Sequence, residues 1–245
     1  AKEAGCDAVQ LHCAHAHHLL GSFLSPIHNK RTDAFGEDIH GRLRLPLAVI
    51  RRIRARVGAD FPILMRISGA EFEPGGRSLE ETQYIVPFFV EAGVDAFNVS
   101  AGTSAMASVS PPMGTPVGIY ASYAAAIKQA VNVPVISVGR ILSPWVAEEI
   151  LSAGRADMVA LGRALLADPE FPRKAASGHW DEIVPCMGDL HCLMRLYADK
   201  TIACMVNAAA GREAEMDLVP AREPKTILVI GGGPGGYIAA IRAAQ

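Results

Sequence analysis

Five short apolar runs, each followed by a stretch with helical character, constrain the fold more than any other feature of this chain. The runs cover residues 7–11, 62–67, 95–100, 133–138 and 157–161. They are rich in the β-branched and aliphatic residues that strands favour. Strands that alternate with helices form parallel sheets, because a parallel pair needs a crossover connection. The pattern predicts an α/β fold, either an open doubly wound sheet or an eight-stranded barrel, and periodicity does not choose between them.

Capping residues mark the ends of two of the predicted helices. Pro46 is expected to open a helix with one apolar face, and Gly58 to end it. Ser78 and Glu81 form a capping-box pattern before the next helix, with Gly93 beyond its end.

Composition narrows the class of function. Half of the 245 residues are hydrophobic and 20% are charged, which is enough for a packed core. The formal net charge is −2 and the basic residues are scattered, so a small-molecule substrate is expected and nucleic acid is not. No apolar run reaches the roughly 18 residues of a membrane span, and a cytoplasmic location is expected. The oligomeric state stays open, a homo-oligomer included.

Four histidines follow the first apolar run, at positions 12, 15, 17 and 18. One or two of them could be structural, but the group as a whole indicates a functional site. An imidazole at the carboxyl end of a strand can bind a carbonyl oxygen and stabilise the charge that develops when a conjugated alkene is reduced. Zinc binding is the competing use, although no further ligand at metal spacing accompanies the group.

Glycine-arginine pairs follow the last two runs, as Gly139-Arg140 and Gly162-Arg163. Either pair alone is typical of a turn followed by a solvated arginine. Two pairs after successive strands predict a phosphate site, because glycine permits close backbone approach and arginine adds charge.

Three of the five cysteines crowd into one window, at Cys186, Cys192 and Cys204. In a cytosolic chain such clustering indicates metal binding more than disulfides. Three buried, reduced cysteines are the alternative.

A Gly-x-Gly-x-x-Gly motif, formed by Gly231, Gly233 and Gly236, follows the apolar run 226–230 and precedes a helical stretch. A strand before the motif and a helix after it are the context that a dinucleotide pyrophosphate needs. So short a segment cannot bury a core of its own, and we expect it to be exposed.

Residues 12–36 together with Arg42 resemble the signature of the Old Yellow Enzyme superfamily, and residues 161–169 match that family closely as well. The resemblance implies a TIM (β/α)8 barrel with FMN at its mouth, in place of the doubly wound sheet. Counted back from the last strands, the five runs would be strands four to eight, and residues 1–182 a partial barrel. The resemblance therefore implies a fragment.

The resemblance also assigns roles to individual residues. His12 and His15 fall on the pair that binds the substrate's oxygen, and His17 falls where the family usually has a proton-donating tyrosine. Arg66 falls on the arginine beside the flavin's N1 and O2 edge, an ordinary ion pair being its alternative. The implied FMN-binding residues are Arg66, Gly139, Arg140, Gly162 and Arg163.

The cysteine segment resembles the NADH:flavin oxidoreductases of the 2,4-dienoyl-CoA reductase, 2-enoate reductase and trimethylamine dehydrogenase type. In that subgroup four cysteines hold a 4Fe–4S cluster, for which soft anionic thiolates are suited. Asp189 stands at the second cysteine's place. It is expected to be a ligand, with His191 as a substitute, and a three-iron cluster or none are alternatives. Residues 183–223 would form this segment and a linker, and residues 224–245 the start of an FAD- or NAD(P)-binding domain.

The implied reaction passes electrons from NAD(P)H through FAD and the iron–sulfur cluster to FMN, which reduces the C=C bond of an enoate or enoyl-CoA type substrate. A flavin-dependent amine dehydrogenase is the runner-up. A sugar-phosphate barrel without flavin and an inactive fragment are the remaining alternatives.

Overall fold

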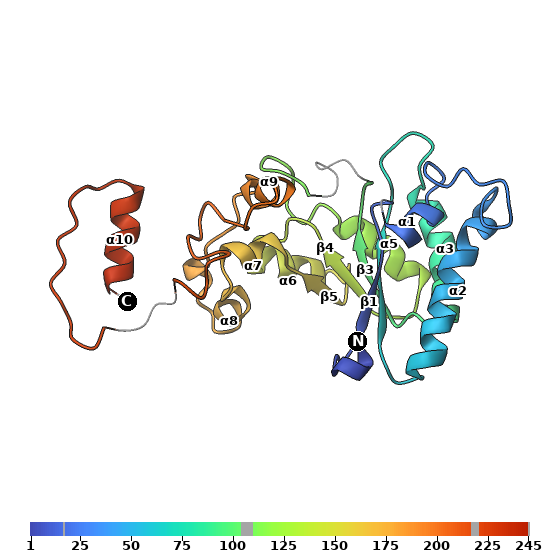
Figure 1. Ribbon diagram of the computed structural model, residues 1–245, viewed down its shortest axis with the longest axis horizontal. Helices are drawn as coiled ribbons and strands as arrows, with labels where there is room; N and C mark the ends of the chain where they lie inside the picture. The colour runs from blue at the N-terminus through green and yellow to red at the C-terminus, as the bar shows by residue number, and fades with distance from the viewer. Residues whose placement is uncertain (17, 104–109, 217–220, 245) are drawn as a thin grey trace.

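A parallel five-stranded sheet forms the centre of the computed structural model, which describes residues 1–16, 18–103, 110–216 and 221–244. The order of strands in the sheet follows their order in the chain (Figure 1). Every strand overlaps one of the predicted runs, so the α/β prediction is confirmed. The strands are β1 (Val9–Cys13), β2 (Ile63–Ser68), β3 (Ala96–Ser100), β4 (Val135–Val138) and β5 (Met158–Ala160).

Helices separate the strands and continue beyond the last of them. No helix in the described ranges is long and apolar enough to cross a membrane. The helices are η1 (Lys2–Ala4), α1 (Leu19–Leu24), α2 (Ile39–Val57), α3 (Leu79–Ala92), α5 (Ala121–Ala130), α6 (Pro144–Ser152), α7 (Arg163–Ala167), α8 (Phe171–Ala176), η2 (Trp180–Glu182), α9 (His191–Tyr197) and α10 (Pro234–Ala244).

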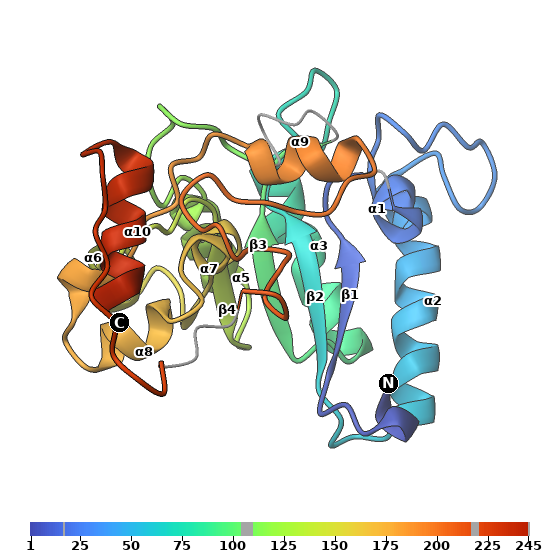
Figure 2. The ribbon, with the colours of Figure 1, turned by 60° about the vertical axis from the view of Figure 1, so that its left-hand side comes forward.

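The hydrophobic core lies between one face of the sheet and helices α2, α3, α5 and α6, with α3 and α5 seen behind the strands in Figure 2. Each helix contributes at least one buried side chain to the core, namely Ile50, Phe89, Ile127 and Ile150. On the central strands this face is fully buried, as at Met65, Phe97 and Val135, whereas Leu11 of β1 and Val159 of β5 are partly buried. Burial of these apolar side chains is the main stabilising contribution to the sheet.

The other face of the sheet carries more polar and more exposed side chains. His12, Arg66 and Asn98 are neighbours across three strands. His12 is exposed and Arg66 only partly buried, and Met158 of β5 is 46% exposed. In a TIM barrel this face of the strands lines the interior. The sheet is therefore consistent with part of such a barrel.

Helix α2 begins earlier than predicted. Asp38 caps it by accepting a hydrogen bond from the backbone N–H of Gly41 at 2.7 Å, so the prediction that Pro46 opens the helix is wrong. Pro46 lies inside α2, where its ring is buried. Proline removes one intrahelical hydrogen bond, and the long helix continues because its other bonds and its apolar face remain. Gly58 ends α2 with a φ of 85°, as predicted.

The cap of α3 is confirmed in part. The Ser78 side chain accepts a hydrogen bond from the backbone N–H of Glu81 at 3.2 Å, and Gly93 ends the helix in the left-handed conformation. The Glu81 carboxylate accepts from Arg42 Nη2 at 2.6 Å. Glu81 thus joins α3 to α2 through this ion pair.

The C-terminal segment differs from its prediction at one point. Helix α10 forms, but residues 226–230 are not a strand. Ile227, Leu228 and Ile230 are 60%, 83% and 90% exposed, and α10 buries no residue. Figure 1 shows α10 apart from the sheet. A strand needs a hydrogen-bonding partner, and no neighbouring strand is present here. The predicted exposure of the segment is confirmed.

Candidate functional site

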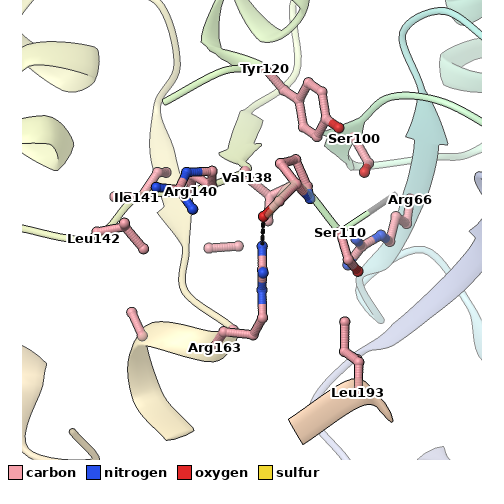
Figure 3. A pocket seen from close by; sticks show the side chains of 15 residues that line it. Arg66, Ser100, Ser110, Tyr120, Val138, Arg140, Ile141, Leu142, Arg163 and Leu193 are labelled. Atoms are coloured by element: carbon pink, nitrogen blue, oxygen red, sulfur yellow. Dashed lines mark hydrogen bonds between the residues drawn. The ribbon is translucent and has the colours of Figure 1, made fainter. Parts of the chain in front are cut away.

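A pocket of about 200 Å³ lies at the carboxyl ends of the strands, beside the turns that follow β4 and β5. Figure 3 shows three arginine side chains on different sides of it. The structure brings together here the five residues that the sequence suggested for FMN: Arg66, Gly139, Arg140, Gly162 and Arg163. We call this cavity the arginine pocket.

Backbone carbonyl groups hold two of these arginines in place. Arg140 Nη1 donates to the carbonyl oxygen of Pro112 at 2.8 Å, and Arg163 Nη2 donates to that of Pro111 at 3.0 Å (Figure 3). The two carbonyls belong to the segment between β3 and α5. This segment therefore orients both guanidinium groups at the wall of the pocket.

Each arginine keeps a buried N–H group that no atom of the described residues accepts. These groups are Arg66 Nε, Arg140 Nε and Arg163 Nη1. A buried donor without a partner costs about 1–3 kcal/mol, and more when it is charged. Burial also lowers the pKa of Arg66. Three such donors around one pocket match a ligand with several anionic oxygens, and a flavin phosphate is such a ligand.

The turn after β4 places glycine where a side chain would not fit. Gly139 has a φ of 114°, and a Cβ there would lie 2.5 Å from the ring of Tyr120. Arg140 follows with a φ of 50°, also left-handed. Burial raises the pKa of Tyr120 to about 12, while the charge of Arg163 opposes the rise. Tyr120 therefore presents a neutral hydroxyl to the arginine pocket at pH 7.

His15 is buried beside the arginine pocket, whereas His12 is exposed. His15 Nδ1 lies 3.3 Å from the carbonyl oxygen of Gly102, and Nε2 lies 3.4 Å from Oγ of Ser100, which lines the pocket. The His12 and His15 rings are edge to face, with centroids 5.8 Å apart. The two histidines are thus neighbours, but with different surroundings. His17 lies outside the described residues.

A second, smaller cavity collects the four predicted metal ligands. Cys186, Asp189, Cys192 and Cys204 line it together with Arg163. Burial raises the pKa of the Cys192 thiol, and the neighbouring thiols of Cys186 and Cys204 raise it further. We call this space the cysteine cavity.

The donor set of the cysteine cavity suits iron, but the cavity is small. Three thiols and a carboxylate surround about 10 Å³, close to the room that one water needs. Within the described part of the chain, no group of three or more His, Cys, Asp or Glu residues has the geometry to hold a single metal ion. The donor types are thus those that iron–sulfur clusters use, while the described residues form no site for a single ion.

The glycine motif lies at the start of α10 and lines neither cavity. Gly231 has a φ of 111°, and a Cβ on Gly236 would overlap the carbonyl oxygen of Gly231. A Cβ on Gly233 would meet no atom within 4 Å. The motif therefore keeps its tight turn without the rest of a nucleotide-binding sheet around it.

Comparison with known proteins decides the family. A family model described as NADH:flavin oxidoreductase / NADH oxidase family matches residues 1–182. The chain belongs to this family. The resemblance stated from the sequence is thereby confirmed, and the family is one of FMN-binding oxidoreductases.

The individual relatives of this chain are larger proteins. It is 44% identical over 247 residues to a metal reductase of Desulforamulus reducens, covering 99% of this chain and 37% of the relative. It is 37% identical over 260 residues to a cinnamate reductase of Clostridium sporogenes, covering 100% of this chain and 39% of the relative. The chain thus spans less than two fifths of the length of these curated relatives.

A solved structure agrees with the fold. A 2-naphthoyl-CoA reductase in complex with 2-naphthoyl-CoA superposes with a TM-score of 0.92 at 30% identity, covering 98% of this chain and 38% of that one. The similarity extends over the sheet, the cysteine segment and the C-terminal helix, since almost the whole chain is covered.

The sequence did not lead us to assign several residues of the site. Tyr120 and Leu193 line the arginine pocket, and the Pro111 and Pro112 carbonyls orient its arginines. The double proline is a visible signal for a rigid turn. Leu193 stands on α9 next to Cys192 and gives no signal in the sequence.

Proposed function

We propose that this chain supplies the FMN site and the cysteine site of a longer NAD(P)H oxidoreductase, which reduces the C=C bond of an enoate or enoyl-CoA type substrate. The observation that carries the proposal is the arginine pocket, where Arg66, Arg140 and Arg163 converge with unsatisfied N–H groups. Similarity to a cinnamate reductase and to a 2-naphthoyl-CoA reductase supports the substrate class.

We further propose that the five strands are strands four to eight of an eight-stranded barrel formed by residues 1–182 and upstream sequence. The parallel order of β1 to β5 and the polar, exposed second face of the sheet support this. Residues 183–223 would then form the cluster segment, and residues 224–245 would begin an FAD- or NAD(P)-binding domain.

Roles in the arginine pocket follow from charge and from backbone geometry. Arg140 and Arg163 would hold the phosphate of FMN, because both present buried N–H groups without partners among the described residues. The backbone at Gly162 is also open to a ligand, since a Cβ there would meet no atom within 4 Å. Arg66 would lie beside the flavin ring, where a fixed positive charge stabilises negative charge. Bound FMN would supply the hydride.

The histidines would act on the substrate. His12 and His15 would bind its carbonyl oxygen and stabilise the negative charge that develops there. Ser100 and the Gly102 carbonyl fix the ring of His15, so its orientation is set before substrate binds. His17 or solvent would supply the proton.

Cys186, Asp189, Cys192 and Cys204 would hold an iron–sulfur cluster, and the glycine motif would bind the pyrophosphate of a dinucleotide. In the longer protein these groups would connect NAD(P)H to FMN.

Flavin binding by this chain tests the site. FMN and riboflavin differ only in the phosphate, so their dissociation constants isolate its contribution. We expect Arg140→Met to weaken FMN binding about tenfold or more, because a charge-assisted hydrogen bond contributes about 1.5–3 kcal/mol. Arg155→Met is the matched control, since Arg155 is a surface residue 46% exposed at its side chain. Equal affinity of the wild type for FMN and riboflavin would refute the FMN site.

The reaction is tested with the polypeptide in which this chain naturally occurs, under anaerobic conditions with NADH or NADPH. We expect the C=C bond of cinnamate, or of an aromatic acyl-CoA thioester, to be reduced to a single bond. Bleaching of the flavin by a methylated amine, without alkene reduction, would identify an amine dehydrogenase instead. Purified polypeptide without flavin absorbance would contradict both.

A further inference from the structure

The arginine pocket and the cysteine cavity share a wall. Arg163 lines both. On α9, Cys192 faces the cysteine cavity while the next residue, Leu193, lines the arginine pocket. The two cavities are therefore bounded by the same arginine and by consecutive residues of one helix.

Gly188 connects the cysteine segment to the arginines. It stands between Cys186 and Asp189, and its carbonyl oxygen accepts a hydrogen bond from the backbone N–H of Met113 at 2.7 Å. Met113 directly follows the two prolines whose carbonyls accept hydrogen bonds from Arg140 and Arg163. One continuous path of contacts thus leads from the cysteine segment to both guanidinium groups.

Close packing at Gly188 leaves no room for a side chain. Its φ is 76°, and a Cβ would overlap Nη1 of Arg140 and lie 3.0 Å from the backbone nitrogen of Met113. The cysteine segment is therefore packed closely against the Arg140 side chain at Gly188.

We propose that Gly188 is a positioning residue for Arg140 and Arg163, so that occupation of the cysteine cavity and binding of a phosphate in the arginine pocket are thermodynamically linked. The inference rests on the proposed function, in which these arginines bind the phosphate of FMN. The physical reason is the shared wall: Arg163 lines both cavities, and Met187 and Asp189, the two neighbours of Gly188, line the cysteine cavity.

The linkage has an expected direction. A cluster bonded to Cys186, Cys192 and Cys204 ties the segment down at three points, and Gly188 lies within the part that is tied. Arginines oriented before the ligand arrives bind it more tightly, because less side-chain entropy is lost. Phosphate affinity should therefore be higher in the protein that holds the cluster.

The first test is the Gly188→Ala variant, titrated with FMN and with riboflavin by flavin fluorescence. We expect FMN binding to weaken about tenfold or more and riboflavin binding to change by less than about twofold, since only FMN uses the displaced guanidinium groups. The ratio of the FMN affinity to the riboflavin affinity separates a loss of arginine positioning, which lowers only FMN binding, from a general folding defect, which lowers the binding of both flavins. Wild-type affinity for FMN in the variant, or equal losses for FMN and riboflavin, would overturn the proposal.

Gly178→Ala is the matched control. Gly178 has a φ of 80°, close to that of Gly188, but a Cβ there meets no atom within 4 Å. Both variants carry a similar backbone strain, and only Gly188→Ala adds the overlap with Arg140. We expect Gly178→Ala to bind both flavins as the wild type does, and a loss of FMN preference in it would count against the role of Arg140.

The second test compares iron-loaded and iron-free protein, prepared anaerobically, with the same two flavins. We expect the loaded wild type to prefer FMN over riboflavin more strongly, and Gly188→Ala to lose this difference. An FMN preference that is present but independent of iron would overturn the linkage and leave the proposed function standing. A wild type without any FMN preference would instead overturn the proposed function.

Discussion

The surroundings of His15 differ from those of His12, although only three positions separate them. His15 is 3% exposed, has a φ of 65° and has contacts at both ring nitrogens. His12 is exposed, and its ring contacts that of His18 in a tilted arrangement with centroids 4.2 Å apart. His15 is thus held within the fold at both ring nitrogens, whereas the exposed His12 accepts a hydrogen bond from the backbone N–H of Ala14 at 3.3 Å.

Alanine substitutions separate these two roles. We expect His15→Ala to lower the free energy of unfolding by about 1–3 kcal/mol, because it leaves a cavity and removes a buried hydrogen bond. His12→Ala should cost less, no more than about 1 kcal/mol, because the side chain is exposed and the hydrogen bond that it accepts from the Ala14 N–H is long, at 3.3 Å. Urea titrations followed by circular dichroism measure both values, and equal losses would contradict the distinction.

Much of the site at this scale was predictable, because residues that follow parallel strands meet at one end of a sheet. Arg140 and Arg163 were expected together on this ground and Arg66 from the family resemblance, and the three line one pocket. The contacts of Gly188 and the Pro112 carbonyl were not predictable, since they join segments far apart in the chain that have no regular periodicity.

At the scale of the elements, the carboxylate of Asp157, just before β5, contacts both α5 and the start of β4. Asp157 accepts hydrogen bonds from Lys128 of α5 at 2.7 Å and from the backbone N–H of Val135 at 2.8 Å. The hydrogen bond from Lys128, followed by that from Val135, lowers the pKa of Asp157 below its usual value of 3.8. Asp157 thus joins a helix to the start of a strand in its ionised form.

The stability that Asp157 contributes should depend on pH. Its pKa is lowered on folding, so the contribution is complete above its unfolded pKa and is lost as the pH falls through the lower, folded value. At pH 7 we expect Asp157→Asn to cost about 0.5–1 kcal/mol, a modest value because the side chain is 38% exposed. Unfolding at pH 7 and at about pH 2 measures the difference. A cost that is the same at both pH values would contradict the assignment.

The loop after β2 is held by a buried ion pair. Glu71 and Arg77 are each 2% exposed at their side chains, and Glu71 Oε2 accepts hydrogen bonds from Ser25 Oγ at 2.9 Å and from the backbone N–H of Arg77 at 3.1 Å. The carboxylate thus ties the loop to the turn after α1.

Removal of the cation from this pair should be strongly destabilising. We expect Arg77→Leu to cost about 3–5 kcal/mol, because it leaves the Glu71 carboxylate buried and unpaired. Arg31→Leu breaks the surface pair with Asp33, which is about half exposed, and should cost no more than about 1 kcal/mol. Thermal unfolding of the two variants gives the comparison, and similar melting temperatures would refute the role of the buried pair.

Strand prediction succeeded where a partner strand was available. The five runs of the sheet pair with one another, so their apolar residues are covered. The run 226–230 has the same character, but it lies without a neighbouring strand and remains irregular. Residue pattern alone predicts the tendency to form a strand, whereas pairing depends on the rest of the domain.

Over the whole molecule, the C-terminal segment contributes little to stability. None of the described residues 221–244 is buried, and α10 packs no side chain into the core. We expect a chain that ends at residue 223 to have a free energy of unfolding within about 0.5 kcal/mol of that of the full chain, because no apolar burial is lost. Differential scanning calorimetry of both chains tests this, and a clearly lower melting temperature of the shortened chain would contradict it.

The identity of chain order and sheet order has a consequence for biosynthesis. Each of the strands β2 to β5 pairs with the strand that left the ribosome before it. Domains are made from the N-terminus at about 5–20 residues per second, so β1 and β2 can pair while β5 is still being translated. The turns that carry the arginine pocket's glycine-arginine pairs emerge last, onto a sheet already in place to receive them.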